Sequence, residues 1–287
     1  MTIRRYRSSI PDVTIPDESL FTFLFEGKID EEIPGTIHVF VDAPTRRSFT
    51  RSEFKAACLS LGWGLRNVFA NELGGMKITR GDTVMILSPN SFAWPLALFG
   101  SISGGFKITF TDPLSTREEL ARKWKDSGAK VVFTNRALVP VVFGMLEKNG
   151  VSEEEARKRI VVMGVGDRDA TADGLIHMDD LRGKGSRAVA ERFDGPLSNE
   201  TVYLCYSSGT TGKPKGVEVS LSYYRVIWYG VLTSAAVDTQ EYHRGLPHAP
   251  TGIPSYPDRK GCVAWDSTVL PYHWYAFRRF FFLEKRD

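Results

Sequence analysis

The sequence is poor in cysteine and histidine, with three and five of them in 287 residues. Neither residue type falls at the spacing of a metal motif such as C-x-x-C or H-E-x-x-H. Cys58, Cys205 and Cys262 also form no even-numbered disulfide framework, which fits a reducing compartment. We therefore predict structural roles for these residues and no metal site made by the protein alone.

The chain also lacks a long apolar run and a one-sided charge. The apolar stretch 92–106 is short and rich in glycine, whereas a membrane helix needs about 20 apolar residues. The 37 basic residues nearly balance the 34 acidic ones, giving a net charge of +3, so a nucleic-acid partner is not indicated. We predict a protein without a membrane span and without a nucleic-acid partner.

No targeting signal stands out. Pro11 and Asp12 interrupt the basic N-terminal segment, which has no continuous apolar stretch of the secretory kind. The last residues are Lys285-Arg286-Asp287 and not the peroxisomal Ser-Lys-Leu. A cytoplasmic location is therefore predicted, and a peroxisomal location stays open for a longer form of the protein.

Apolar strands alternate with helical patterns along the chain. Capping boxes at Thr50–Glu53 and Thr116–Glu119 predict two helix starts, and Gly74-Gly75 and Gly128 predict the matching ends. Further helices are predicted over 91–103 and 137–148, strands over 83–87, 106–110, 130–134, 160–163 and 201–206, and surface loops over 164–200. This alternation predicts an α/β fold, a mostly parallel sheet with helices on both faces.

The most informative segment directly follows the last predicted strand. It reads Tyr206-Ser207-Ser208-Gly209-Thr210-Thr211-Gly212-Lys213-Pro214-Lys215-Gly216. Hydroxyls and backbone N–H groups can donate to phosphate oxygens, glycines allow close approach, and lysines add positive charge. The segment therefore predicts a loop that binds a triphosphate, although a plain polar turn between two strands is the simpler alternative.

The common P-loop does not fit this segment. That motif places a glycine five residues before its Gly-Lys-Ser/Thr ending, and here Ser207 occupies that position before Gly212-Lys213. Pro214 then stands where a hydroxyl would hold Mg²⁺. The loop must belong to another phosphate-binding class.

The loop resembles the signature of the adenylate-forming (AMP-binding) superfamily, which includes acyl-CoA and aryl-CoA ligases. The resemblance covers about residues 20 to 220 and is strongest to 4-coumarate-CoA-ligase-like enzymes. Upstream segments carry it as well: Arg80-Gly81-Asp82-Thr83-Val84, Ser88-Pro89-Asn90-Ser91, Gly104-Gly105, Asp112-Pro113-Leu114-Ser115-Thr116 and Ser127-Gly128-Ala129-Lys130. It implies a two-step reaction in which a carboxylic acid and ATP form an acyl-adenylate, and a thiol such as CoA displaces AMP.

The resemblance also implies roles for particular residues. The β- and γ-phosphates of ATP, with Mg²⁺ shared among them, would be bound by Ser207, Ser208, Gly209, Thr210, Thr211, Gly212, Lys213 and Lys215. Catalysis would consist mainly of positioning and charge stabilisation, and no catalytic residue is assigned. His273 is a candidate for the acid pocket, but it stands one residue early for the family's Leu-Pro-x-x-His-x-x-Gly motif, so a place in an aromatic core patch is equally compatible.

Beyond Ser220 the sequence departs from the family pattern. We expect residues 1–220 to form the first sub-domain of an incomplete N-terminal domain, and 221–287 a divergent or truncated start of the second. The Tyr-Gly-x-Thr-Glu segment and the small C-terminal lid domain with its lysine are absent from this sequence, so impaired catalysis is expected. A non-catalytic ATP- or AMP-binding module, a decayed ligase and a misfolding fragment are the alternatives. The particular acid cannot be read from the sequence.

Overall fold

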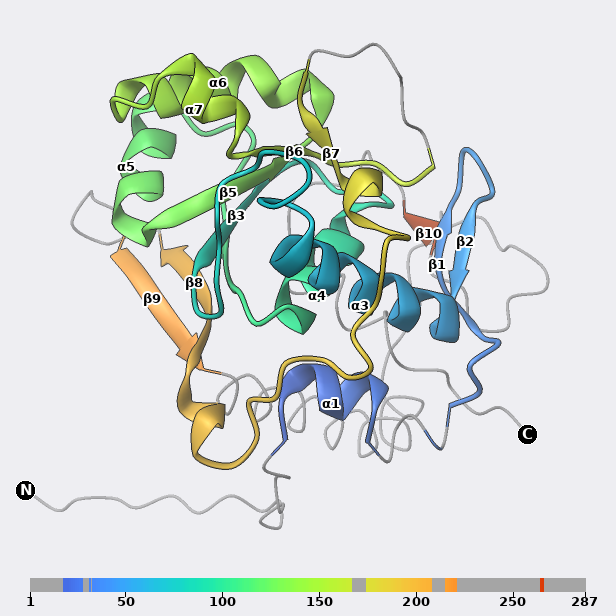
Figure 1. Ribbon diagram of the computed structural model, residues 1–287. Helices are drawn as coiled ribbons and strands as arrows, with labels where there is room; N and C mark the ends of the chain where they lie inside the picture. Colours follow the sequence, from blue (N-terminus) through green and yellow to red (C-terminus); the bar gives the residue numbers. More distant parts are fainter. Residues whose placement is uncertain are drawn as a thin grey trace, which may run out of the picture.

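The computed structural model describes residues 18–27, 31, 33–166, 174–207, 215–220 and 264–265. Its centre is a seven-stranded sheet in the order β7-β6-β5-β3-β4-β8-β9 (Figure 1). The strands are β3 (Thr83–Leu87), β4 (Lys107–Phe110), β5 (Ala129–Thr134), β6 (Ile160–Val162), β7 (Ile176–His177), β8 (Thr201–Ser207) and β9 (Lys215–Ser220). All neighbouring pairs run parallel except β8 and β9, which are antiparallel.

Helices cover both faces of this sheet, as the alternating pattern predicted (Figure 1). One face carries α1 (Leu20–Phe25), α3 (Arg51–Asn67) and α4 (Trp94–Ser103), and the other carries α5 (Arg117–Ser127), α6 (Val139–Lys148) and α7 (Glu153–Arg157). A smaller sheet places β1 (His38–Asp42) between β2 (Ser48–Thr50) and β10 (Ala264–Trp265).

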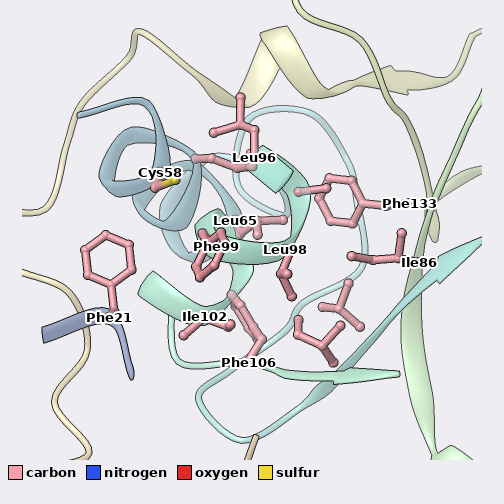
Figure 2. Packing of buried hydrophobic residues seen from close by; sticks show 14 of the residues in the cluster. Phe21, Cys58, Leu65, Ile86, Leu96, Leu98, Phe99, Ile102, Phe106 and Phe133 are labelled. Carbon is pink, nitrogen blue, oxygen red and sulfur yellow. The ribbon is translucent and has the colours of Figure 1, made fainter. Parts of the chain in front are cut away.

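The strand residues alternate between two apolar clusters, as a pleated strand requires. Val84 and Ile86 of β3 pack with α3 and α4, whereas Met85 and Leu87 pack with α5 and α6. Figure 2 shows Ile86 in the same apolar cluster as Leu98 and Phe99 of α4. Burial on both faces explains why β3 reads as one continuous apolar run.

Both predicted capping boxes are confirmed. The Thr50 amide donates to Glu53 Oε2 at 2.8 Å, and the Glu53 amide donates back to Thr50 Oγ1 at 3.3 Å. The same reciprocal pair joins Thr116 and Glu119 at the start of α5, at 2.9 and 3.3 Å. Gly128 ends α5 with a φ of 61°, in the left-handed region that glycine adopts most readily.

The predicted end of the first long helix was wrong. α3 ends at Asn67, because the amides of Val68 and Phe69 both donate to the carbonyl oxygen of Gly64 and turn the chain. Gly74-Gly75 instead closes the following loop, where the Gly75 amide donates to the Phe69 carbonyl at 2.8 Å. The apolar pattern continued past Asn67 because the turn itself is buried.

Other elements differ from the prediction only locally. α4 begins at Trp94, three residues later than predicted, because a turn from Ser91 precedes it and places Pro95 in the first helical turn. The stretch 174–200, predicted as loop, contributes the edge strand β7 and two short 3₁₀ turns. The hairpin β1–β2 and the helices α1 and α7 had no counterpart in the sequence prediction.

In the part of the chain that the structure describes, no helix is both long and apolar enough to cross a membrane.

Candidate functional site

The parallel strands end together at one edge of the large sheet, and polar segments follow three of them, β3, β4 and β5. Ser88-Pro89-Asn90 follows β3, Thr111-Asp112 follows β4, and Asn135 follows β5. Ser207 is the last residue of β8. Ligands of open parallel sheets bind beyond this carboxyl edge, so these segments outline the candidate site.

Side-chain hydrogen bonds hold this carboxyl edge together. Thr134 Oγ1 donates to the Leu87 carbonyl at 2.8 Å and joins β5 to β3, while Thr109 Oγ1 donates to the Leu204 carbonyl at 3.0 Å and joins β4 to β8. Asp112 Oδ1 accepts a bond from the Leu114 amide at 2.9 Å, which fixes the turn after β4. The strand ends therefore have defined positions relative to one another.

The predicted phosphate loop starts and ends at this edge. Ser207 at the end of β8 is paired with Lys215, the exposed first residue of β9. The other predicted phosphate-binding residues lie between these two positions in the chain and outside the described residues; they are Ser208, Gly209, Thr210, Thr211, Gly212 and Lys213. His273, the candidate for the acid pocket, is also outside the described residues. The structure thus confirms the strand that leads into the loop and adds the antiparallel strand that follows it.

Lys123 of α5 is a cation at the same edge that the sequence interpretation missed. Its Nζ lies 3.4 Å from both Thr111 Oγ1 and Ser115 Oγ, and 5.9 Å from the centre of the Tyr206 ring. Burial lowers the pKa of Lys123, and the nearby Glu119 and Asp112 carboxylates only partly oppose this.

Among the described side chains, Lys123 has no salt-bridge partner. The sequence did contain a signal for it. Lys123 lies three residues after the buried Leu120 and next to the buried Trp124, so it borders the inner face of α5. Helical side chains also lean toward the N-terminus of their helix. For α5 that end is the carboxyl edge of the sheet.

Other motif segments lie at the opposite, amino edge. Asp82, just before β3, forms a salt bridge of 2.8 Å with Lys130 at the start of β5. Burial opposes the ionisation of Asp82, but the hydrogen bonds from Lys130 and Thr79 outweigh it and lower the pKa of the carboxyl. These residues stabilise the fold and lie away from the candidate site.

Arg80 gathers a second group of side chains at the amino edge. Its guanidinium lies 3.2 Å from Glu191, 3.0 Å from Glu200 and 4.6 Å from the centre of the Phe193 ring. Gly105, before β4, has a φ of 85°, and a Cβ there would come within 2.9 Å of Glu191 Cγ. The glycine thus leaves the space in which Arg80 and Glu191 meet.

Within the described ranges, no three His, Cys, Asp or Glu side chains come close enough together to hold a metal ion. Those residues therefore supply no metal cage of their own.

Comparison with known families agrees with this architecture. The family model described as AMP-binding enzyme matches residues 33–247. The chain therefore belongs to the AMP-binding enzyme family, the adenylate-forming superfamily indicated by its phosphate loop.

Two curated plant relatives are CoA ligases within this family. The chain is 33% identical over 217 residues to 4-coumarate–CoA ligase 5 of Oryza sativa subsp. japonica, covering 75% of this chain and 35% of that protein. It is 34% identical over 180 residues to peroxisomal OPC-8:0-CoA ligase 1 of Arabidopsis thaliana, covering 62% and 29%. The chain thus spans about a third of the length of the curated relatives that it matches.

A solved structure supports the fold. The luciferase-like enzyme from the nonluminescent mealworm Zophobas morio matches with a TM-score of 0.61 and 21% identity, over 81% of this chain and 49% of that one. At this identity the match shows that the two chains share an architecture.

Proposed function

We propose that the chain is the ATP-binding part of an acid–thiol ligase that activates a carboxylic acid as an acyl-adenylate and transfers it to CoA. The observation that supports this proposal is the sequence rich in glycine and hydroxyl side chains that connects the paired residues Ser207 and Lys215 at the carboxyl edge. Family membership supports the adenylate chemistry, and the 4-coumarate and OPC-8:0 ligases among the relatives support a CoA ligase.

In this proposal the loop binds the ATP phosphates. Hydroxyls and amides of Ser207, Ser208, Gly209, Thr210, Thr211 and Gly212 surround the β- and γ-phosphates, and Lys213 and Lys215 neutralise their charge. Mg²⁺ is held through the phosphate oxygens. His273 stays a candidate for the acid pocket. The expected partners are ATP and a small-molecule carboxylic acid, and the expected location is the cytoplasm or the peroxisome.

We further propose that residues 1–220 form the first sub-domain of the nucleotide-binding domain and that 221–287 begin a divergent second one. The Tyr-Gly-x-Thr-Glu segment of the family does not occur within these 287 residues. The 287-residue chain by itself is therefore expected to bind Mg²⁺-ATP without completing the ligase reaction. Robust pyrophosphate release that depends on an added carboxylic acid would contradict this expectation.

Calorimetry with Mg²⁺-ATP tests the phosphate loop. The wild-type chain should bind, and the double variant Thr210→Ala/Lys213→Ala should lose binding, because it removes a donor and a cation from the loop. Lys125→Ala is the matched control, since it removes an exposed lysine of α5 and should bind as the wild type does. A folded wild-type chain that binds no Mg²⁺-ATP would overturn the proposal.

A further inference from the structure

Tyr206 lies near the end of β8, just before the predicted phosphate loop, and its side chain contacts α5. The hydroxyl donates a hydrogen bond of 2.7 Å to Asp126 Oδ2 in the last turn of that helix. A weaker contact of 3.5 Å reaches the Lys123 carbonyl oxygen. The end of β8 is thus attached to a helix that begins more than 80 residues earlier in the chain.

The second strand of the hairpin meets the same carboxylate. Gly216 of β9 is paired with Tyr206, and a Cβ at Gly216 would lie 3.3 Å from Asp126 Oδ2 and 3.5 Å from the Tyr206 ring. The distance to Asp126 is tighter than ordinary packing, whereas the distance to the Tyr206 ring is an ordinary contact, so a side chain at Gly216 would press mainly against the Asp126 carboxylate. Both ends of the loop therefore converge on one residue of α5.

The tyrosine keeps its proton in this setting. Burial is the larger cause and the hydrogen bond to Asp126 the smaller, and together they raise the pKa of the Tyr206 hydroxyl well above its ordinary value. The hydroxyl is therefore protonated at neutral pH and can donate the hydrogen bond to Asp126. The Lys123 ammonium, 5.9 Å from the ring centre, adds a cation–π contact on the same side chain.

We propose that the Tyr206–Asp126 hydrogen bond is a positioning contact that fixes where the phosphate loop leaves β8 and returns on β9. The inference rests on the proposed ATP-binding function. Seven residues, 208–214, connect the two paired ends, so the placement of these ends limits where the donors of the loop can lie. Phosphate donors lose much of their binding energy when they are displaced by about 1 Å.

The test compares four single variants and one double variant. Tyr206→Phe removes only the donor, Asp126→Ala removes the acceptor, and Asp126→Asn keeps an oxygen that can still accept the bond. Tyr203→Phe is the matched control, because it makes the same chemical change on the same strand, where the ring stacks on Phe110. Each variant is titrated with Mg²⁺-ATP and with AMP, which lacks the β- and γ-phosphates.

The proposal predicts that Tyr206→Phe and Asp126→Ala each weaken Mg²⁺-ATP binding about tenfold, the scale of one hydrogen bond to a charged group. Affinity for AMP should stay unchanged. Asp126→Asn should recover most of the loss, and Tyr203→Phe should bind as the wild type does. The double variant Tyr206→Phe/Asp126→Ala should be no weaker than either single one, because both remove the same contact.

Amide hydrogen exchange without nucleotide gives a second readout. Tyr206→Phe should speed exchange in residues 206–207 and 215–216, and Tyr203→Phe should not. If the wild-type chain binds Mg²⁺-ATP and Tyr206→Phe binds it with the same affinity, the positioning role is wrong but the proposed function stands. An equal loss of ATP and AMP binding in Tyr206→Phe would likewise contradict only the positioning role. A wild-type chain that binds no Mg²⁺-ATP would overturn the proposed function and, with it, this role.

Discussion

The two edges of the large sheet use their charged residues differently. At the amino edge, Asp82 is paired with Lys130, and Arg80 is paired with Glu191 and Glu200. At the carboxyl edge, Lys123 contacts two hydroxyls and an aromatic ring, and Lys215 is exposed. The basic residues Arg80 and Lys130 at the amino edge are thus neutralised by carboxylates, whereas Lys123 and Lys215 at the carboxyl edge form no salt bridge with any described residue.

This difference distinguishes family-like segments that stabilise the fold from family-like segments that border the candidate nucleotide site. Arg80-Gly81-Asp82 and Gly104-Gly105 resemble the family as closely as Ser88-Pro89-Asn90 does, yet they lie at opposite edges. Changes at the amino edge should therefore lower stability and leave nucleotide binding intact. Changes at the carboxyl edge should weaken nucleotide binding and leave stability nearly unchanged.

Gly105→Ala should give the largest loss of stability at the amino edge, about 2–3 kcal/mol in the free energy of unfolding. The substitution places a Cβ at a positive φ and against Glu191, which disturbs the contact with Arg80. Urea denaturation measures the effect. Gly128→Ala is the control, with a φ of 61° and no atom near the new Cβ, and should cost about 1 kcal/mol. Equal losses in the two variants would show that crowding at Glu191 contributes nothing.

Arg80→Ala should lower the free energy of unfolding by about 1–2 kcal/mol, because it removes two partly exposed ion pairs and the contact with the Phe193 ring. Thermal denaturation with and without Mg²⁺-ATP would show a lower melting temperature and the same nucleotide-induced increase as in the wild type. Loss of that increase would argue against a division of roles between the edges.

Asp82→Asn should cost about 1 kcal/mol at pH 7, since it removes the pair with Lys130. The pKa of Asp82 is lowered in the folded state, so its contribution is fully present above the ordinary value of about 3.9 and is lost as pH falls through the lower folded pKa. Denaturation at several pH values should show the two proteins converging below about pH 4. A difference that persists at low pH would assign the effect to something other than this charge.

Lys123→Met should have the smallest effect on stability, within about 0.5 kcal/mol, because the ammonium is partly desolvated and the described residues offer it no salt bridge. Affinity for Mg²⁺-ATP should fall about threefold to tenfold through loss of a nearby positive charge. Lys125→Met removes an exposed lysine of the same helix and should change neither quantity. A loss of more than about 1 kcal/mol in the free energy of unfolding would show that Lys123 stabilises the fold, as Arg80 and Asp82 are expected to do.

Local signals made part of this fold predictable. Both capping boxes and the Gly128 helix end depend on residues within one turn of each other, so the sequence alone identified them. The strand that leads into the phosphate loop followed equally from its apolar run and the hydroxyl-rich segment after it. The roles assigned to residues 208–213 and to His273 stay predictions.

The long-range arrangement could not be read in the same way. β4 pairs with β8, although Thr109 and its partner Leu204 are 95 residues apart. The convergence of Arg80 with Glu191 and Glu200 depends on that same pairing. The helical pattern could place Lys123 beside the buried face of α5, but its contacts with Thr111 and Tyr206 depend on the position of the sheet edge.

Amide hydrogen exchange with and without Mg²⁺-ATP tests the central claim most directly, because one experiment reports on both edges. Nucleotide should protect the carboxyl edge, in residues 88–90, 111–116 and 204–207, and leave residues 79–83, 104–106 and 127–130 at the amino edge unchanged. Protection confined to the amino edge, or no protection at the carboxyl edge despite measured binding, would contradict the account.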